Sequence, residues 1–435
     1  MKQQHKFTEI ESGEISEDWD IKPAEMFCSR VTDGTHDSPK KQEQGKYLIT
    51  SRHLKDGYLD FSNAYYIKEE DFIDANRRSK VDRWDVLFSM IGTIGEVYLE
   101  KADKIGYAIK NVGLFKSGGE ELKGKWIFYY LRSKEAKEYI RKSRAGTTQE
   151  YITLDSLRMF PICFPKDENE MQQIVNILDS IQDKLEICKQ MNITLEKIGQ
   201  ALFKHWFIDF EFPNENGKPY KSSGGEMVDS DLGEIPEGWR MAVLPEVSVV
   251  VDCLHTKKPE MIQEGRLLLQ VYNIATDGTL DFTEKYPVSE GDYQEWIRNI
   301  EVKEGDCLIT NAGRVGAVGQ VPMGFKGGIG RNITAIRPVG VTPAYLFRYL
   351  FSSYGLGEIG RQTDQGTVLD SLNVKGVKKI RILIPLRAVM DKFEEIARPL
   401  REKVERNKSE NDYLVAIRDS LLPRLMSGQI RVPAG

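Results

Sequence analysis

The chain has 435 residues with a formal net charge of −5, 40% hydrophobic and 29% charged residues. This predicts roughly two to three globular domains with buried cores, and the acidic balance weighs mildly against nucleic acid as a partner, because DNA-binding proteins are often basic. The five scattered cysteines indicate neither a zinc site nor a disulfide framework, and they favour a reduced, cytoplasmic setting. Residues 1–14 are polar, which predicts no signal peptide. No apolar run approaches ~18 residues, which predicts no membrane contact.

The first region, residues 1–166, contains short apolar runs separated by turn signals. The runs and the closing strand-like segment lie at 45–50, 84–89, 95–99 and 159–165, and a short helix is expected within 125–141. Asp56-Gly57 is a tight-turn dipeptide typical of hairpins. These features predict a mixed α/β domain with mostly antiparallel strands.

A long helix is predicted over residues 167–210, where apolar residues recur at alternating steps of three and four. This spacing is a heptad seam, formed by Ile174, Leu178, Ile181, Leu185, Cys188, Leu195 and Leu202, with Asn192 and Gly199 filling the gaps. About 40 residues would form a rod of ~60 Å. That length favours a coiled coil over the alternative, an amphipathic helix lying on its own domain.

The same order of elements then repeats after a linker at 211–232, which is rich in Pro, Gly, Asn and Ser. A second domain is expected at 233–386, a second long helix at 387–427 and a tail at 428–435. The second seam contains Phe393, Ala397, Leu400, Val404, Leu414 and Leu421, and Asn411 occupies the slot of Asn192. A polar seam residue commonly fixes register or partner. Pro399 predicts a kink or the true start of this helix, and Ser427-Gly428 predicts its end.

The two halves are copies of one another. Trp19 returns as Trp239, 220 positions later, and Gly57, Gly92 and Asn111 return as Gly278, Gly313 and Asn332, each 221 positions later. This period is too long for a solenoid repeat, so each copy is a full domain. The predicted fold is therefore α+β: two homologous mixed α/β domains separated by two long helices that pair as an antiparallel coiled coil, with an approximate two-fold symmetry.

The order and spacing of five segments resemble the specificity subunit of type I restriction-modification enzymes over nearly the whole chain. The segments are DGTHDSP at 33–39, GTTQ at 146–149, ALFKHWF at 201–207, LGEIPEGW at 232–239 and LLPRLMSG at 421–428. The resemblance implies that the globular units are target recognition domains, each reading half of a bipartite asymmetric site. The second copy has CLHTKKP at 253–259, where the Asp-Gly-Thr-His signature is lost, so any shared role for that loop stays open.

The resemblance also implies the partners. The helices would set the spacer and dock methyltransferase subunits, two per chain, and restriction subunits would join the complex on double-stranded DNA. This chain would hold no cofactor, whereas the partner subunits of the family use S-adenosylmethionine, ATP and Mg²⁺.

Catalytic motifs are missing from the sequence. It has no Asn-Pro or Pro-Pro dipeptide, no GxGxG turn and no P-loop, and none of its five histidines lies beside an elbow-like serine. These absences predict a non-catalytic recognition subunit, place no metal site in the chain and disfavour a self-sufficient nuclease.

DNA recognition requires loop donors for bases and basic groups for phosphates. The candidates are His36, Ser38, Lys40, Lys41, Arg52, His53, Arg77, Arg78, Thr147, Thr148, Gln149, Thr256, Lys257, Lys258, Tyr272, Asn273, Arg314, Arg331, Asn332, Gln362, Thr363, Gln365 and Thr367. For any single candidate, a solvated surface residue is the competing interpretation. His36 and His255 could each be structural histidines.

Aromatic and apolar residues at the helix ends are candidates for partner docking, because aromatics are enriched in interface cores. They are Phe203, Trp206, Phe207, Leu422, Leu425 and Met426, and capping of a local core is the alternative. A competing function for the whole chain is a tandem coiled-coil adaptor that clamps a symmetric protein partner without recognising DNA.

Overall fold

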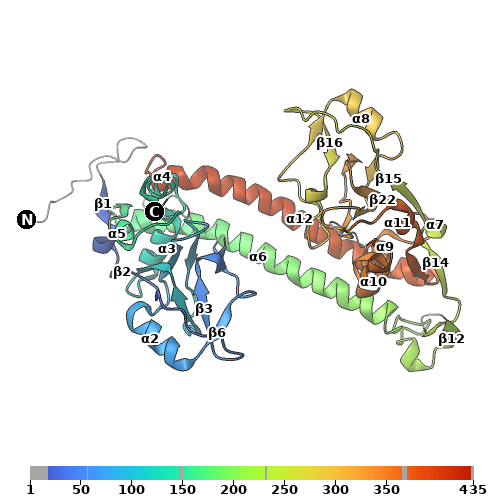
Figure 1. Cartoon of the computed structure of the whole chain (residues 1–435), viewed down its shortest axis with the longest axis horizontal. Helices are drawn as coiled ribbons and strands as arrows, with labels where there is room; N and C mark the ends of the chain where they lie inside the picture. The colour runs from blue at the N-terminus through green and yellow to red at the C-terminus, as the bar shows by residue number, and fades with distance from the viewer. Residues whose placement is uncertain (1–17, 56, 147–149, 231–232, 365–369, 433–435) are drawn as a thin grey trace, which may run out of the picture. The chain divides into compact units, whose positions relative to one another are not determined.

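The computed structural model describes residues 18–55, 57–146, 150–230, 233–364 and 370–432 (Figure 1). The chain divides into two compact units, the first made of residues 1–186 and 412–435 and the second of residues 187–411. The long helices α6 (Glu168–Phe207) and α12 (Arg387–Met426) each contribute one half to either unit. Neither they nor any other helix in the described ranges is both long and apolar enough to span a membrane.

The globular part of the first unit is an α/β domain. Its strands are β1 (Trp19–Pro23), β2 (Arg30–Asp33), β3 (Lys46–Thr50), β4 (Leu54–Lys55), β5 (Tyr58–Leu59), β6 (Tyr65–Ile67), β7 (Val86–Ser89), β8 (Val97–Leu99), β9 (Tyr107–Lys110), β10 (Val112–Lys116) and β11 (Pro161–Pro165). Its helices are α1 (Ala24–Phe27), the 3-10 turn η1 (Ser51–His53), α2 (Glu69–Ser79), α3 (Glu121–Tyr130), α4 (Lys134–Ser143) and α5 (Leu154–Arg158). The single helix expected within 125–141 is therefore wrong; two helices occur there, and the Ser133 side chain caps the second.

The second unit repeats these elements. Its strands are β12 (Met227–Ser230), β13 (Gly233–Pro236), β14 (Arg240–Val243), β15 (Ser248–Asp252), β16 (Arg266–Leu269), β17 (Pro287–Val288), β18 (Val302–Lys303), β19 (Cys307–Thr310), β20 (Val318–Gln320), β21 (Lys326–Ile329), β22 (Ile333–Pro338) and β23 (Arg381–Ile384). Its helices are η2 (Lys221–Ser223), α7 (Leu244–Val247), η3 (Val271–Asn273), α8 (Glu290–Trp296), α9 (Pro343–Phe351), α10 (Ser353–Arg361) and α11 (Val374–Lys379).

The central sheets have the same strand order in both copies, although β18 adds a strand to the second of them in the second copy. The order β2-β10-β7-β8 returns as β15-β22-β19-β20, and the pair β1-β11 returns as β14-β23, all antiparallel. The parallel pair β3-β9 returns as β16-β21. The register also repeats, because Asp33 lies opposite Gly113 and Asp252 lies opposite Thr334. The predicted duplication of a mixed, mostly antiparallel domain is confirmed.

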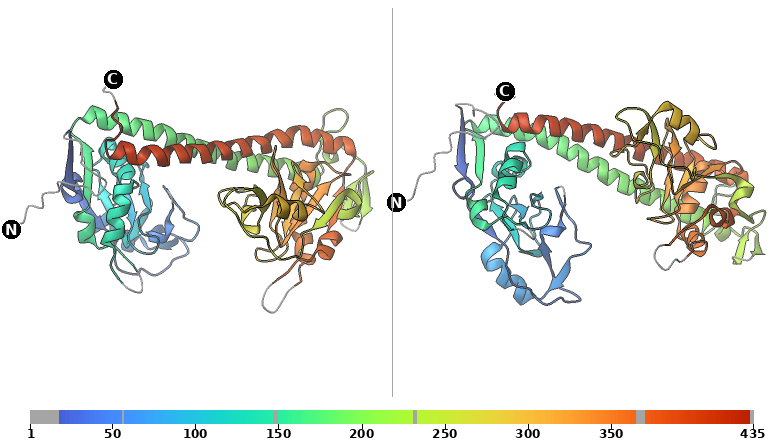
Figure 2. Two further views of the ribbon diagram at one scale, coloured as in Figure 1. Left: turned by 90° about the horizontal axis from the view of Figure 1, so that it is seen from above. Right: turned by 45° about the horizontal axis from the view of Figure 1, so that its top comes forward.

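The two long helices pair within each unit. In the second unit the Phe203 and Phe393 rings lie 6.1 Å apart and Asn192 donates to the Val404 carbonyl, so residue numbers rise along α6 as they fall along α12. In both views of Figure 2 this half of α6 runs beside this half of α12. In the first unit, Leu178 shares a core with Leu422. The predicted antiparallel pairing is confirmed.

Details of the seam differ from the expectation. Across from Asn192 lies Asn407, which is fully buried and donates to the Asn192 side-chain oxygen at 2.7 Å, so the polar layer includes a residue that the seam analysis did not name. Pro399 does not mark the start of α12, which begins at Arg387.

The segment predicted as a linker is largely folded. Phe212 is buried and stacks between the rings of Tyr220 and Trp239, with centroids 4.5 and 5.1 Å away. Strand β12 pairs with β13. The composition suggested a flexible chain, but its aromatic residues complete the core of the second domain.

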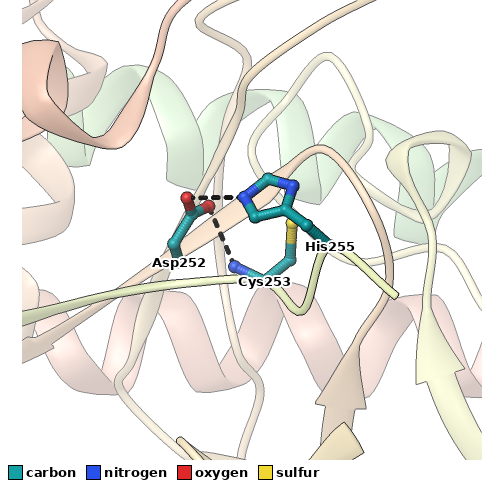
Figure 3. A group of neighbouring side chains, drawn as sticks. All are labelled: Asp252, Cys253 and His255. Carbon is teal, nitrogen blue, oxygen red and sulfur yellow. Dashed lines mark hydrogen bonds and ion pairs between the residues drawn. The ribbon is translucent and has the colours of Figure 1, made fainter.

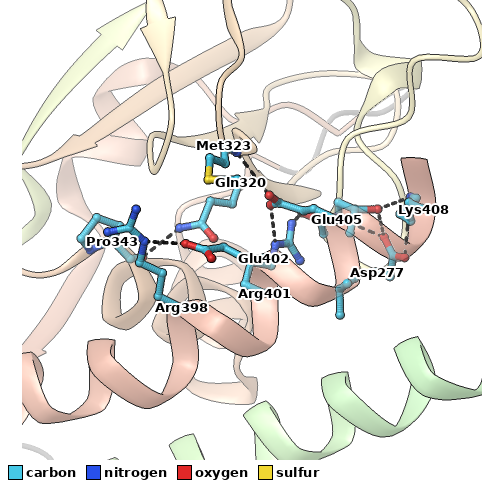
Figure 4. A network of polar contacts seen from close by, with 12 residues as sticks. Asp277, Gln320, Met323, Pro343, Arg398, Arg401, Glu402, Glu405 and Lys408 are labelled. Carbon is cyan, nitrogen blue, oxygen red and sulfur yellow. Dashed lines mark hydrogen bonds and ion pairs between the residues drawn. The ribbon is translucent and has the colours of Figure 1, made fainter. Parts of the chain in front are cut away.

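Helix α12 is fixed to the second domain through a polar network around the Asp277-Gly278 turn (Figure 4). The buried Arg401 donates to the Gly278 carbonyl at 2.7 Å and to Glu405 at 3.2 Å, and Glu405 accepts the Met323 backbone N–H at 3.2 Å. Lys408 donates to the Thr279 hydroxyl. The Asp277-Gly278 turn, the counterpart of the turn predicted at Asp56-Gly57, is therefore the site at which the helix docks.

Gly199 on α6 lies against a buried ion pair that leaves no room for a side chain at this position. Arg348 is only 5% exposed and contacts Glu196 at 2.6 Å, and Arg401 contacts the same carboxylate at 3.4 Å. A Cβ on Gly199 would lie 2.5 Å from an Arg348 guanidinium nitrogen. Burial lowers the pKa of Arg348, although Glu196 opposes this effect. Breaking such a pair leaves an uncompensated buried charge, which is strongly destabilising.

We expect Gly199→Ala to lower the unfolding midpoint of the chain in a denaturant titration. Alanine improves helix propensity by about 1 kcal/mol, but overpacking costs about 1–3 kcal/mol and displaces Arg348 from Glu196. Gly360→Ala on α10 is the matched control, because its added Cβ would meet no atom within 4 Å, and it should raise the midpoint slightly. Equal midpoints for the two variants would contradict this role of Gly199.

His53 and Asn273 perform the same structural task in the two copies. Each is buried at the end of a 3-10 turn, where His53 Nδ1 accepts the Thr50 backbone N–H and Asn273 Oδ1 accepts the Gln270 backbone N–H, both at 2.8 Å. Burial lowers the pKa of His53. The ring is therefore held neutral, with Nδ1 as the acceptor.

His53→Asn should retain the stability of the native chain at pH 7.5, because asparagine makes this bond in the second copy, whereas His53→Leu should cost about 1–3 kcal/mol by leaving a buried N–H unpaired. The lowered pKa gives a pH signature. The unfolded chain binds a proton near pH 6.5 that the folded chain resists, so His53 makes stability fall as pH drops below about 6.5. His53→Asn should remove that part of the decline in unfolding experiments at pH 5.5–7.5. An unchanged pH profile would contradict the neutral, buried ring.

Candidate nucleic-acid interface

Several loops of the first domain meet at one edge of its sheets. The Asn111 backbone N–H donates to the Thr35 carbonyl at 3.2 Å, and the Ser51 hydroxyl donates to the Asn111 carbonyl and accepts the Met90 N–H. Residues 91 and 145 both form bridges to Tyr151. Contacts therefore link loops 33–38, 51–53, 90–95 and 110–111 with residues 145–146 and 150–151, and these include or flank most of the predicted binding segments.

The second domain assembles the matching loops. The Asn311 backbone N–H donates to the Asn332 carbonyl at 2.8 Å, and its side chain donates to the Leu372 carbonyl at 2.6 Å. Arg314 donates to the Ile274 carbonyl. The loops at 252–258, 271–274, 311–316, 331–332 and 364–372 therefore correspond to those of the first domain, apart from the residues that lie outside the described ranges.

Glycine turns shape this edge for a backbone reason. Gly92 and Gly313 both have φ of +79°, a region that favours glycine. In each turn a hydroxyl at the end of the strand, Ser89 or Thr310, accepts a backbone N–H and donates to a turn carbonyl. Tight hairpins therefore explain these glycines.

An aspartate–histidine pair occurs at the same place in both copies, which corrects the expectation that the second copy has lost the signature. His36 Nε2 lies 3.1 Å from Asp33, and His255 Nε2 lies 3.0 Å from Asp252. Only the intervening residues differ. His36 Nδ1 also lies 2.8 Å from the Asn111 side-chain oxygen. Because a carboxylate only accepts, Nε2 is the donor in each pair.

Cys253 joins the second pair in Figure 3. The Asp252 carboxylate accepts the Cys253 backbone N–H at 2.9 Å, and ligand atoms of Asp252, Cys253 and His255 lie within 4.8 Å of one another. Burial raises the pKa of the Cys253 thiol, although the backbone N–H groups of Ile333 and Asn332 hydrogen-bond to it. These are zinc-type ligands. The first copy, however, has the same pair with Gly34 in place of the thiol, so the pair does not depend on a metal.

Most DNA-contact candidates lie on the surface. The exposed ones are His36, Ser38, Lys40, Lys41, Arg52, Arg77, Arg78, Thr256, Lys257, Lys258, Tyr272, Arg314, Arg331 and Asn332, and Gln362 and Thr363 are half-buried. Some cations are engaged: Arg77 pairs with Asp74, and Arg78 pairs with Asp33. The Lys258 ammonium lies 3.8 Å from the centroid of the Tyr286 ring, and burial lowers its pKa.

The remaining basic candidates carry charge that the chain does not neutralise. Within the described ranges, Lys40, Lys41, Arg52, Lys257 and Arg331 form no ion pair. An acidic chain therefore presents unpaired positive charge on the loops that converge in each domain.

Two groups of candidates are placed differently. His53 and Asn273 are 1% and 3% exposed and cannot reach DNA, so their prediction as contacts is wrong. Thr147, Thr148, Gln149, Gln365 and Thr367 lie outside the described residues.

The six docking candidates are corrected as well. Phe203, Trp206 and Phe207 belong to the core of the second unit, and Leu422, Leu425 and Met426 belong to the core of the first. Each is at most 6% exposed. Capping of a local core, the simpler interpretation, accounts for their positions.

Sequence reasoning included Arg331 among the candidates but missed its counterpart at this edge, Lys110. Lys110 and Arg331 occupy matching positions 221 apart, each followed by an asparagine with positive φ, 51° at Asn111 and 64° at Asn332. The signal was present, because the repeat aligns a basic residue with a basic residue.

The comparisons with known proteins agree with this architecture. A family model described as the type I restriction modification DNA specificity domain matches residues 17–197. The MjaIX specificity subunit of a type I restriction enzyme from Methanocaldococcus jannaschii is 27% identical, and the match covers 98% of this chain and 97% of that protein. The HindI specificity subunit from Haemophilus influenzae is 26% identical over 70% of this chain and 77% of that protein.

A solved structure shares the fold. The S subunit of a type I restriction-modification system from M. genitalium superposes with a TM-score of 0.57 at 17% identity, covering 94% of this chain and 96% of that one. The duplicated domains, the paired helices and the full-length relatives agree: over nearly its whole length, the chain is similar to the specificity subunits of type I restriction enzymes.

Proposed function

We propose that this chain is the DNA sequence-recognition subunit of a type I restriction-modification complex, in which each globular domain reads one half of a bipartite asymmetric site. The observation that carries the proposal is the convergence, in each domain, of matching loops bearing unpaired cations and hydrogen-bonding side chains. Cations hold phosphates, and Arg, Asn and Gln side chains discriminate bases.

The net charge of −5 is compatible with this function. Salt screens exposed charges over about 10 Å, so the potential at a DNA surface depends mainly on nearby loops. Partner subunits would supply further positive charge. The tandem adaptor without DNA binding explains the duplication but gives no reason for clustered cations on matching loops, so it is not favoured.

The chain acts without catalysis of its own. We propose that methyltransferase subunits, two per chain, and restriction subunits supply the chemistry, and that these partners hold the S-adenosylmethionine, ATP and Mg²⁺. The long helices would set the unread spacer between the half-sites.

The docking surface on the helices must differ from the six buried residues. Ile187, Met191 and Ile198 lie along one face of α6 and are 54%, 38% and 47% exposed, at spacings of four and seven residues that keep them on one side of a helix. Exposed apolar side chains in a row are typical of protein interfaces. We propose that a methyltransferase subunit covers this face.

A chain with two copies of one domain gives a direct test. Replacing residues 233–386 with residues 18–166 should produce a complex that methylates a site in which the first half-site occurs twice, because both domains would then read that half-site. Methylome sequencing of a host that carries this chain as its only specificity subunit measures the motif.

The reciprocal chain, with two second domains, is the matched control and should methylate a site in which the other half-site occurs twice. Retention of the original asymmetric motif in either chain would refute one-domain, one-half-site recognition.

A further inference from the structure

The duplication separates two kinds of contact on the candidate interface. If the two domains read different half-sites, the bases they meet differ, but the phosphodiester backbone is the same in both. Positions that keep their chemistry between the copies are therefore suited to the backbone, and positions that differ are suited to bases. This reasoning rests on the proposed function.

Some shared positions have a purely structural cause. His53 and Asn273 are buried caps of 3-10 turns. Asn111 and Asn332 have left-handed backbones, which asparagine tolerates better than most residues. These pairs need no ligand to explain them.

A basic residue is shared by two equivalent turns, one between β9 and β10 and one between β21 and β22, whose residues 110–111 and 331–332 we call the tips. Lys110 ends β9, and Arg331 follows β21 after one glycine; both precede the left-handed asparagine. Arg331 is exposed and forms no ion pair within the described ranges, and Lys110 only donates to the Ser38 hydroxyl. No buried acid holds either cation, so neither is explained by packing.

The shared aspartate–histidine loop packs against each tip. In the first domain, residue 35 bridges Lys110 and the His36 ring lies 2.8 Å from the Asn111 side chain. In the second, Asp252 at the start of the loop lies opposite Thr334, two residues after Asn332. The histidine side chains are 62% and 72% exposed, and surface pairs of this kind contribute little stability.

We propose that tips 110–111 and 331–332 are two equivalent phosphodiester sites, in which Lys110 and Arg331 each neutralise a DNA phosphate. The pairs Asp33–His36 and Asp252–His255 are positioning residues that hold the loop beneath each tip. Positions that differ between the copies, such as Ser38 and Lys257, Arg52 and Tyr272, or Thr93 and Arg314, are left to read bases.

The test uses the reconstituted complex with its methyltransferase subunits and two duplexes, one with the methylated motif and one with that motif scrambled. Arg331→Ala should weaken binding to both duplexes by the same factor, lower the slope of log K against log salt by about 0.9 and leave the methylated motif unchanged. Lys110→Ala should do the same. Lys326→Ala, at the opposite end of β21, is the matched control and should change neither quantity.

The positioning role has its own readout. His255→Gln should weaken binding to both duplexes equally, and the double variant with Arg331→Ala should bind no more weakly than Arg331→Ala alone, because the histidine acts through the tip. Unfolding midpoints should match the native chain, since these side chains are exposed. Arg314→Ala should instead weaken binding to the motif duplex alone.

Three results would overturn the proposal: a loss confined to the motif duplex in Arg331→Ala, a changed methylation motif, or an unaltered salt slope. Failure of the native complex to prefer its motif duplex would instead refute the proposed function, so the two outcomes are distinct.

Discussion

Each globular core is completed by both long helices, and the rest of the structure depends on this constraint. The first core includes Leu178 from α6 and Met426 from α12, and the second includes Phe207 and Phe393 from the same two helices. Neither domain therefore completes its core with the long helix of its own repeat alone. The second copy of the helix is needed to finish the first domain, which ties the end of the chain to its beginning: a Cβ on Gly428 would lie 3.2 Å from the Trp19 ring.

This sharing explains why the helix-end residues are buried. Aromatic clusters at the end of an exposed rod would be poor for solubility, but inside a core they bury large apolar areas. Phe207, for example, lies 4.8 Å from the Tyr345 ring and 4.9 Å from the Phe393 ring, centroid to centroid. The pairing of α6 with α12 is then selected by polar groups at fixed positions. Asn407 bonds to Asn192, and Glu196 lies between two buried arginines. Sliding one helix along the other would therefore leave a buried charge without its partner.

The sequence was informative where one physical signal dominated. The heptad spacing of Ile174, Leu178 and Ile181 required a paired helix, and Gly57 and Gly278 adopt the positive φ expected of their turns. It was uninformative where two signals competed. The composition of residues 213–225 is typical of a linker, so the sequence did not indicate that Tyr220 stacks on Phe212 and folds the segment. Pro399 lacks only one helical hydrogen bond, and α12 continues because its neighbours pack on the domain. The burial of His53 could not be read from its loop-like neighbours, although its alignment with Asn273 was a clue.

Duplication gives this chain an internal comparison that a single domain lacks. Buried positions that keep their chemistry report the fold, as the 3-10 caps do, whereas a half-buried or exposed cation kept at both tips without an ion pair is suited to a ligand that both domains share. Only the backbone of DNA is common to two different half-sites. A cation repeated at Lys110 and Arg331 then supplies affinity in both domains, while Thr93 and Arg314 are free to diverge. Specificity can therefore change at one set of positions without loss of the electrostatic attraction between the cations and the DNA phosphates, because phosphate contacts carry no sequence information.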